Sequence, residues 1–312
     1  MVHLARTHAF AHSFLLCTRQ LVHLIARYKF CVLEFSDEGK LVTVANGDVE
    51  DTIGRPAECG HICVVDEEST MIGLHMYDGH LKIIPIDGQG GLSEQAFNVR
   101  LEELKVVDLA FVGKGVLGVL YEDTKGARGV RSYRLGAGGA LEDGEMGRVS
   151  GIDGGMLVGV GGGVCLVVGK QTVTKYDGMF GISSVSSYGY GDGRAVMMKA
   201  HAKVGKGTVL LGDSMGGLYV CDFGGEGVVV QRVGETSICS GLAYLDSGVV
   251  FVGSGLGDSM LVRLSEGGLE VLDTMKNLGP IVDFVCGEQG LVICGGGGVK
   301  QVRLMVGDWN HC

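Results

Sequence analysis

The sequence predicts an all-β fold, a seven-bladed-type β-propeller of about six to seven four-stranded blades. Three observations indicate it. A unit of apolar strand, turn rich in Gly and Asp, and second apolar strand recurs along the chain. Glycine, which favours tight turns, makes up 56 of the 312 residues. Several inner runs are continuously apolar, as in strands buried on both faces.

The recurring unit is a hairpin, and it is clearest in four places. These are Met71–Met76 and Leu81–Ile86 around Tyr77–Gly79, Thr208–Leu211 and Leu218–Phe223 around Gly212–Gly217, Val249–Val252 and Met260–Leu264 around Gly253–Gly257, and Leu291–Cys294 and Val299–Leu304 around Gly295–Gly298. Weaker copies turn near Tyr28, Asp123 and Gly169. Successive turns are 41 to 50 residues apart, a period typical of propeller blades.

Each hairpin is predicted to lie between two outer runs. Ile238–Leu245 precedes one hairpin and Leu269–Met275 follows it, which gives four strands for that unit. The chain has a single tryptophan, Trp309, and no periodic Trp-Asp or Gly-His dipeptides, so the propeller is of a non-WD40 lineage. Ser93–Lys105 is the only helix-like stretch, and it is short and ambiguous.

The N-terminal residues differ from the rest. Residues 1–27 contain three arginines and no acid, which a targeting segment could explain. We favour instead an unrelated or disordered segment at residues 1–19, followed by the propeller at residues 20–312.

Composition narrows the function classes. The net charge is −10 and no stripe of Lys and Arg is present, so direct nucleic-acid binding is not expected. No apolar run reaches the roughly 18 residues of a membrane span. Most of the ten cysteines lie scattered in apolar runs, which favours a reducing compartment, the nucleus or the cytoplasm; examples are Cys31, Cys165, Cys221 and Cys286.

No catalytic residue, metal or cofactor is predicted from the motifs. The glycine loops at 159–163 and 253–257 lack the third glycine of a dinucleotide-binding fingerprint. Gly169-Lys170 resembles the end of a P-loop, but Gln171 follows where a P-loop has Ser or Thr. We therefore interpret these glycines as turn residues. Cys59, His61 and Cys63 alternate as on one strand but lack the second pair that zinc needs. The chain is therefore not expected to be an enzyme; a propeller hydrolase with a metal in its channel is the alternative of a different class.

Two acidic features are predicted to be structural. Asp66, Glu67 and Glu68 stand beside Ser69 and are expected in an exposed turn. Asp51 and Arg55 are expected to form an ion pair in a loop.

Several segments resemble the first propeller of the damage-specific DNA-binding protein 1 family, the adaptor of cullin-4 ubiquitin ligases. They are DTIGRPAECG at 51–60, MIGLHMYDGHLKIIPID at 71–87, AFNVRLEELKVV at 96–107, GETSICSGLAYLDSGVVFVGSGLGDSMLVRL at 234–264 and NLGPIVD at 277–283. The order and spacing of the family are kept from about residue 20 to about residue 305.

The resemblance implies a non-enzymatic protein-interaction scaffold that receives an amphipathic helical segment of a substrate receptor. Family residues of the receptor-facing patch are matched here by Leu256, Pro280, Ile281 and Val282, although Ile281 and Val282 also suit a core strand. Gly255 replaces a family arginine, and Gly295–Gly298 replaces a longer loop.

The resemblance has limits as well. It implies a propeller without its opening strands, and it places cullin docking in a propeller that this chain does not match. The alternatives left open are an RNA-processing scaffold, as in related polyadenylation and splicing proteins, and a nonfunctional fragment.

Overall fold

The structure is a computed structural model of residues 1–312. It describes residues 6–7, 13–18, 21–26, 29–50, 53–55, 62–86, 96–103, 105–136, 140–150, 154–177, 181–188, 196–225, 227–265, 268–277, 281–287, 290–295 and 301–305. For residues 6–26, 143–150, 181–183 and 281–305 only the backbone is described. Within these ranges the chain is all-β, as predicted, and no helix that could span a membrane occurs.

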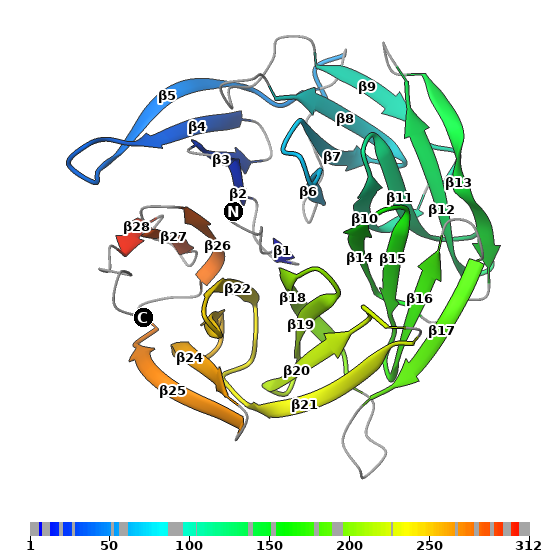
Figure 1. The fold of residues 1–312 in the computed structure, drawn as a ribbon. Helices are drawn as coiled ribbons and strands as arrows, with labels where there is room; N and C mark the ends of the chain where they lie inside the picture. Colours follow the sequence, from blue (N-terminus) through cyan, green and yellow to red (C-terminus); the bar gives the residue numbers. More distant parts are fainter. Residues whose placement is uncertain are drawn as a thin grey trace. The chain divides into compact units, whose positions relative to one another are not determined.

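The described strands form seven antiparallel sheets, six of which contain four consecutive strands in the order of the chain (Figure 1). This succession is the blade architecture of a propeller. The chain divides into two compact units, one of residues 1–49, 199–221 and 231–312 and the other of residues 50–198 and 222–230.

The second unit contains three complete blades. Their strands are β6 (Cys63–Val65), β7 (Met71–Tyr77), β8 (His80–Pro85) and β9 (Phe97–Arg100); β10 (Lys105–Gly113), β11 (Val116–Glu122), β12 (Arg128–Leu135) and β13 (Leu141–Ser150); and β14 (Met156–Gly161), β15 (Val164–Val168), β16 (Thr172–Asp177) and β17 (Gly181–Ser187). The first strands of successive blades, β6, β10 and β14, lie beside one another.

The first unit contains most residues of the remaining sheets. Their strands are β2 (Ser13–Thr18), β3 (Leu21–Ala26), β4 (Lys29–Phe35) and β5 (Leu41–Asp48); β18 (Met198–Gly205), β19 (Thr208–Asp213), β20 (Gly217–Asp222) and β21 (Val229–Glu235), joined by β1 (Arg6–Thr7); β22 (Gly241–Asp246), β23 (Val249–Gly253), β24 (Ser259–Ser265) and β25 (Gly268–Met275); and β26 (Ile281–Gly287), β27 (Gly290–Gly295) and β28 (Gln301–Met305).

The repeat predicted the hairpins correctly. All seven predicted turns fall at or beside the connection between the second and third strands of a sheet, as Asp78 does between β7 and β8. The helix-like stretch Ser93–Lys105 contains β9 instead, because pairing of Phe97–Arg100 with β8 outweighs a weak helical pattern.

Residues 1–19 contain β1 and β2. β2 pairs with β3 along its whole length, and β1 pairs with β18 through Arg6 opposite His201 and Thr7 opposite Ala200. The domain boundary after residue 19 stays a prediction.

The core lies between the faces of neighbouring blades. Leu81, Ile83, Leu117 and Val119 pack between the blades of β6–β9 and β10–β13 in one cluster. Leu210, Leu218, Leu242 and Val250 belong to the corresponding cluster between β18–β21 and β22–β25. Burial of these strands on both faces explains their continuous apolar runs.

Candidate functional site

The predicted site residue that the structure describes best is Leu256, at the tip of the β23–β24 loop. Its surface is 81 % exposed. A large apolar side chain that is this exposed at a loop tip packs little against the core, and its surface is available for contact.

Hydrogen bonds hold the loop that carries Leu256. The Ser254 hydroxyl is buried and accepts hydrogen bonds from the backbone N–H groups of Leu256 (3.4 Å) and Gly257 (2.9 Å). The Gly255 N–H donates to the Ser240 hydroxyl at 2.8 Å. Ser240 lies on the connection from β21 to β22, so this bond joins the loop to the neighbouring connection.

A second exposed apolar tip lies on the neighbouring blade. Met215, in the β19–β20 turn, is 57 % exposed. The buried Asp213 carboxylate forms this turn by accepting the N–H groups of Met215 (2.7 Å) and Gly217 (2.8 Å) and the Tyr219 hydroxyl (2.9 Å). Gly216 has φ +91°, and a Cβ there would overlap the Thr236 carbonyl oxygen. Only glycine allows this close approach.

Ile238, 37 % exposed, lies on the connection that touches both tips. The Thr236 N–H donates to the Gly216 carbonyl at 2.7 Å, and the Ser237 N–H donates to the Met260 sulfur at 3.4 Å. We call residues 214–216, 236–240 and 254–257 the connector surface. Its exposed apolar side chains are Met215, Ile238 and Leu256.

The connector surface carries no charged residue in sequence, and the first charged residue after it is the exposed Asp258. The Asp258 carboxylate accepts the Asn277 N–H at 2.8 Å. This bond brings the connection that leads to β26 next to the loop of Leu256.

The other predicted site residues lie on or before β26. Pro280 is outside the described residues. Ile281 is the first residue of β26 and lies opposite Gly295. The register then skips Val282, since Asp283 lies opposite Cys294, so Val282 occupies a β-bulge. The backbone therefore brings the start of β26 and the Leu256 loop to the same end of adjacent blades, and the contact role of these residues stays a prediction.

Sequence reasoning missed Met215 and Ile238. A single apolar residue between small polar ones is the signal that could have found them, as in Ser214-Met215-Gly216 and Ser237-Ile238. Such a residue cannot enter the core from a tight turn, so it faces solvent.

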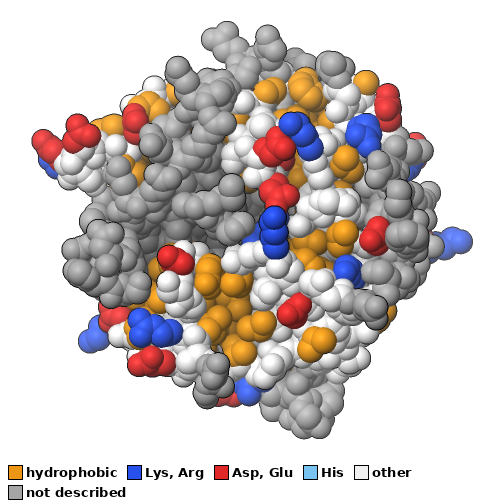
Figure 2. All heavy atoms as spheres, viewed as in Figure 1, with side chains coloured by type: hydrophobic (Ala, Val, Ile, Leu, Met, Phe, Trp, Pro, Cys, Tyr) orange, Lys and Arg blue, Asp and Glu red, His pale blue; other side chains and the backbone are white. Residues whose placement is uncertain are grey.

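On the face shown in Figure 2, the described charged side chains are not grouped in the way that the hydrophobic ones are. Figure 2 shows hydrophobic side chains grouped over β22–β24, while Lys, Arg, Asp and Glu are interspersed over β6–β16. Mixed charges of this kind do not make the basic stripe that a nucleic acid requires.

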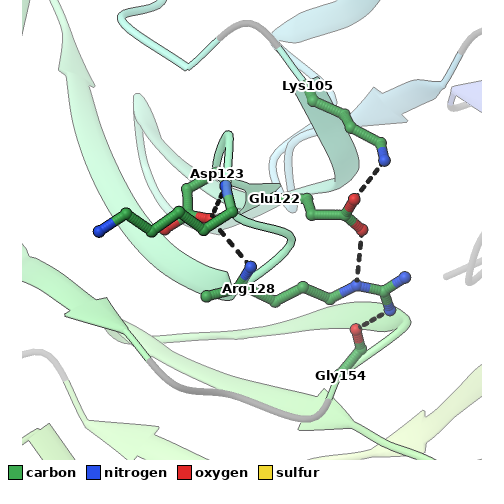
Figure 3. Close-up of polar contacts among 7 residues, drawn as sticks. Lys105, Glu122, Asp123, Arg128 and Gly154 are labelled. Carbon is green, nitrogen blue, oxygen red and sulfur yellow. Dashed lines mark hydrogen bonds and ion pairs between the residues drawn. The ribbon is translucent and has the colours of Figure 1, made fainter.

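One connected group of charged residues is structural (Figure 3). Glu122 accepts a hydrogen bond from Lys105 and pairs with Arg128, whose guanidinium also donates to the Gly154 carbonyl. The hydrogen bond from Lys105 is the main reason that the pKa of Glu122 lies below its ordinary value. The group connects the blade of β10–β13 to the residues that precede β14, and each oxygen of the Glu122 carboxylate has a partner within the group.

Asp66 corrects a sequence expectation. It is buried instead of lying in an exposed turn, and it accepts hydrogen bonds from Thr70 N (2.6 Å), Thr70 Oγ1 (2.6 Å) and Met71 N (2.7 Å). The carboxylate stabilises the turn between β6 and β7, because these part-buried donors would otherwise lose their acceptor.

The remaining motifs supply no site. Gly161, Gly162 and Gly163 form the β14–β15 turn with positive φ, which confirms turn glycines. Cys63 is buried in β6, while Cys59, His61 and Asp51 lie outside the described residues. Arg55 stacks on the Tyr77 ring at 3.6 Å. No group of metal-binding side chains occurs in the part of the chain that the structure describes.

Comparison with known proteins identifies relatives of this architecture. Residues 16–276 match the family model described as the RSE1/DDB1/CPSF1 first beta-propeller. The chain is 38 % identical to DNA damage-binding protein 1a of Arabidopsis thaliana over 97 % of its length, and 38 % identical to DNA damage-binding protein 1 of Oryza sativa subsp. japonica over 90 %. It spans 30 % and 28 % of those proteins, respectively.

Proposed function

Because the chain belongs to the RSE1/DDB1/CPSF1 first β-propeller family, we propose that it is a non-enzymatic protein-interaction scaffold that docks a partner on the connector surface. The observation that supports this most is the exposure of Leu256 on a loop whose backbone is held by Ser254 and Ser240. A rigid loop with an exposed apolar tip binds with little loss of conformational entropy.

The finer proposal follows the resemblance. Leu256, Pro280, Ile281 and Val282 contact an amphipathic helical segment of a substrate receptor, as in an adaptor of a ubiquitin ligase that acts in the DNA damage response. We place this scaffold function in the nucleus and the cytoplasm. We assign no cullin contact to these residues, since the resemblance places cullin docking in a different propeller.

Gly255 changes the size and the charge of the contact surface beside Leu256. Where the family has an arginine, this residue has no side chain, and its N–H bonds to Ser240. The loop therefore presents Leu256 without a cation beside it, which removes contact area and a charge. We expect receptors that rely on apolar contacts at this position and not on a carboxylate.

Affinity purification tests the proposal. The tagged full chain, Leu256→Glu and the control Val271→Glu are expressed in cells, and bound proteins are identified by mass spectrometry. Val271 is also exposed but lies on the outer strand β25, away from the connector surface. We expect ubiquitin-ligase receptors with the unchanged chain and with Val271→Glu, and a loss of at least tenfold with Leu256→Glu. A buried charge opposite an apolar partner carries that penalty.

Two results would overturn the proposal. Recovery of the same receptors by Leu256→Glu would move docking elsewhere. Recovery of cleavage or splicing factors without receptors would assign the chain to an RNA-processing scaffold. Circular dichroism of the purified variants shows that each retains its β structure.

A further inference from the structure

We infer that the docking surface extends across two blades, from Leu256 through Ile238 to Met215, and that it fits one kind of partner. The helical segment is that of the proposed function; what is new is that its apolar stripe covers Met215 and Ile238 and that it carries a basic residue placed to meet Asp258. The inference rests on the proposed function and names the occupant of the same surface.

The three apolar side chains come from segments in direct contact. Gly216 packs on the Thr236 carbonyl, and Gly257 lies near Ser237, where a Cβ would stand 3.5 Å from the Ser237 hydroxyl. The connection of Ile238 is thus bordered by the turn of Met215 on one side and the loop of Leu256 on the other. A partner that covers Ile238 contacts both blades.

The backbone of the surface disfavours an extended partner strand. Strand addition needs free main-chain groups, because hydrogen bonds between backbones provide its affinity. Here the N–H groups of Gly255, Leu256 and Gly257 donate to serine hydroxyls. Those of Met215 and Gly217 donate to the Asp213 carboxylate. A partner that satisfies its own backbone, as a helix does, is therefore favoured.

The side chains suit a helix that varies in sequence. Methionine is flexible and polarisable, so Met215 can adapt to different apolar residues. Leu256 and Ile238 are branched and better defined. Apolar residues at i, i+3, i+4 and i+7 of a helix form one stripe. Such a stripe can contact Met215, Ile238 and Leu256 together, because the residues between them on the connector surface are small.

Charge decides which helix binds best. No Lys or Arg stands on the connector surface, and the exposed Asp258 borders Leu256. Its described hydrogen bond comes from the uncharged Asn277 N–H. The exposed Lys276 forms no ion pair with Asp258 among the described contacts. An Arg or Lys of the partner can pair with the Asp258 carboxylate, whereas an acidic residue of the partner is repelled by it.

Selection from a phage library of random peptides of 18 residues, on the full chain, tests the inference. Peptides that also bind Leu256→Glu are removed by counter-selection. We expect the selected peptides to share an apolar stripe and an Arg or Lys at one fixed position. Fluorescence polarisation then measures a labelled peptide from this set and its Gln counterpart against each variant.

The expected pattern is specific. Met215→Ser and Ile238→Ser weaken binding by about fivefold to tenfold, since each removes a buried apolar contact. Asp258→Asn weakens binding of the basic peptide by about twofold to fivefold and leaves the Gln peptide unchanged, as expected for an exposed ion pair. Val271→Ser, off the surface, changes neither.

The outcomes separate the inference from the proposed function. Peptides lost with Leu256→Glu but unaffected by Met215→Ser, Ile238→Ser and Asp258→Asn would overturn the extended surface and leave the docking role intact. Selected peptides that are acidic, or that contain proline in place of a helical stripe, would overturn the partner chemistry. Failure to select any peptide that depends on Leu256 would overturn both.

Discussion

At the scale of single residues, buried aspartates hold the blades together. Asp108 on β10 is fully buried, and its carboxylate accepts the Leu109 N–H at 2.9 Å and the Leu157 N–H of β14 at 2.6 Å. One side chain thus satisfies donors on two neighbouring blades. Asp66 and Asp213 satisfy turn donors in the same way.

Replacement of Asp108 by alanine should lower the free energy of unfolding by about 2–3 kcal/mol, because two buried N–H groups lose their acceptor. Urea denaturation followed by circular dichroism measures the change. Asp273→Ala is the control: Asp273 is exposed on β25, and the described hydrogen bond of its carboxylate comes from the adjacent Thr274 N–H, so the loss of stability should stay within about 0.5 kcal/mol. Equal effects of both changes would contradict the role of Asp108.

The burial and the hydrogen-bond partners of these aspartates could not be predicted from the sequence. An acid between turn residues was expected to be exposed, and for Asp66 that was wrong. Nothing in the sequence says which aspartate will find two or three N–H groups around it, since the donors are fixed only when the strands are packed. Met215 was missed for the same reason: its exposure depends on the Asp213 turn.

At the scale of elements, the hairpin was predictable and the strand edges were not. Alternation of apolar runs with Gly and Asp turns determines where β7 and β8, or β23 and β24, begin and end. The outer strands instead contain bulges at Val44, Ser183 and Leu272, where the pairing register skips one residue. Such bulges bend an edge strand and hinder pairing with another chain, and they leave no signal in composition.

Turn geometry at the connector surface can be tested by adding one methyl group. Gly216→Ala forces alanine into φ +91° and places its Cβ against the Thr236 carbonyl. The free energy of unfolding should fall by about 2–4 kcal/mol, because the left-handed conformation and the overlap with the carbonyl both destabilise the folded state. Peptides selected on the full chain should bind the variant at least fivefold more weakly, because the Met215 turn must move away from Ile238.

Gly162→Ala is the matched control for this change. Gly162 has φ +64° in the β14–β15 turn, but a Cβ there has no neighbour within 4 Å. Gly162→Ala should therefore lower the free energy of unfolding only through the left-handed backbone conformation, by about 1–2 kcal/mol, and peptide binding should not change. If the two variants lost equal stability, the packing of Gly216 on Thr236 would not be needed to hold the surface.

At the scale of the whole molecule, the family model and the repeat agree on a propeller, and the arrangement of its segments adds one feature. The chain passes between its two compact units four times, so neither unit is a continuous segment. Residues 222–230 belong to the second unit, where the Lys175 ammonium donates to the Phe223 carbonyl at 3.0 Å. They include Val229 and Val230, the first two residues of β21, while the rest of that strand lies in the first unit.

This sharing of segments should make unfolding a single cooperative transition, which buried thiols can report. Cys165 belongs to the second unit, and Cys221 and Cys239 belong to the first; all three are buried. Burial raises the pKa of Cys165 to about 12, and it also raises the pKa of Cys239. The thiolate is the reactive form, so at pH 8 none of them should react with N-ethylmaleimide in the folded chain.

Labelling pulses at increasing urea concentrations, read by mass spectrometry of peptides, give a midpoint for each cysteine. We expect Cys165, Cys221 and Cys239 to share one midpoint, because opening of the second unit pulls residues 222–230 away from β16 and with them the start of β21. The half-buried Cys31 is the internal control, and it should react before the transition. Labelling of Cys165 at clearly lower urea than Cys239 would show that the two units unfold independently.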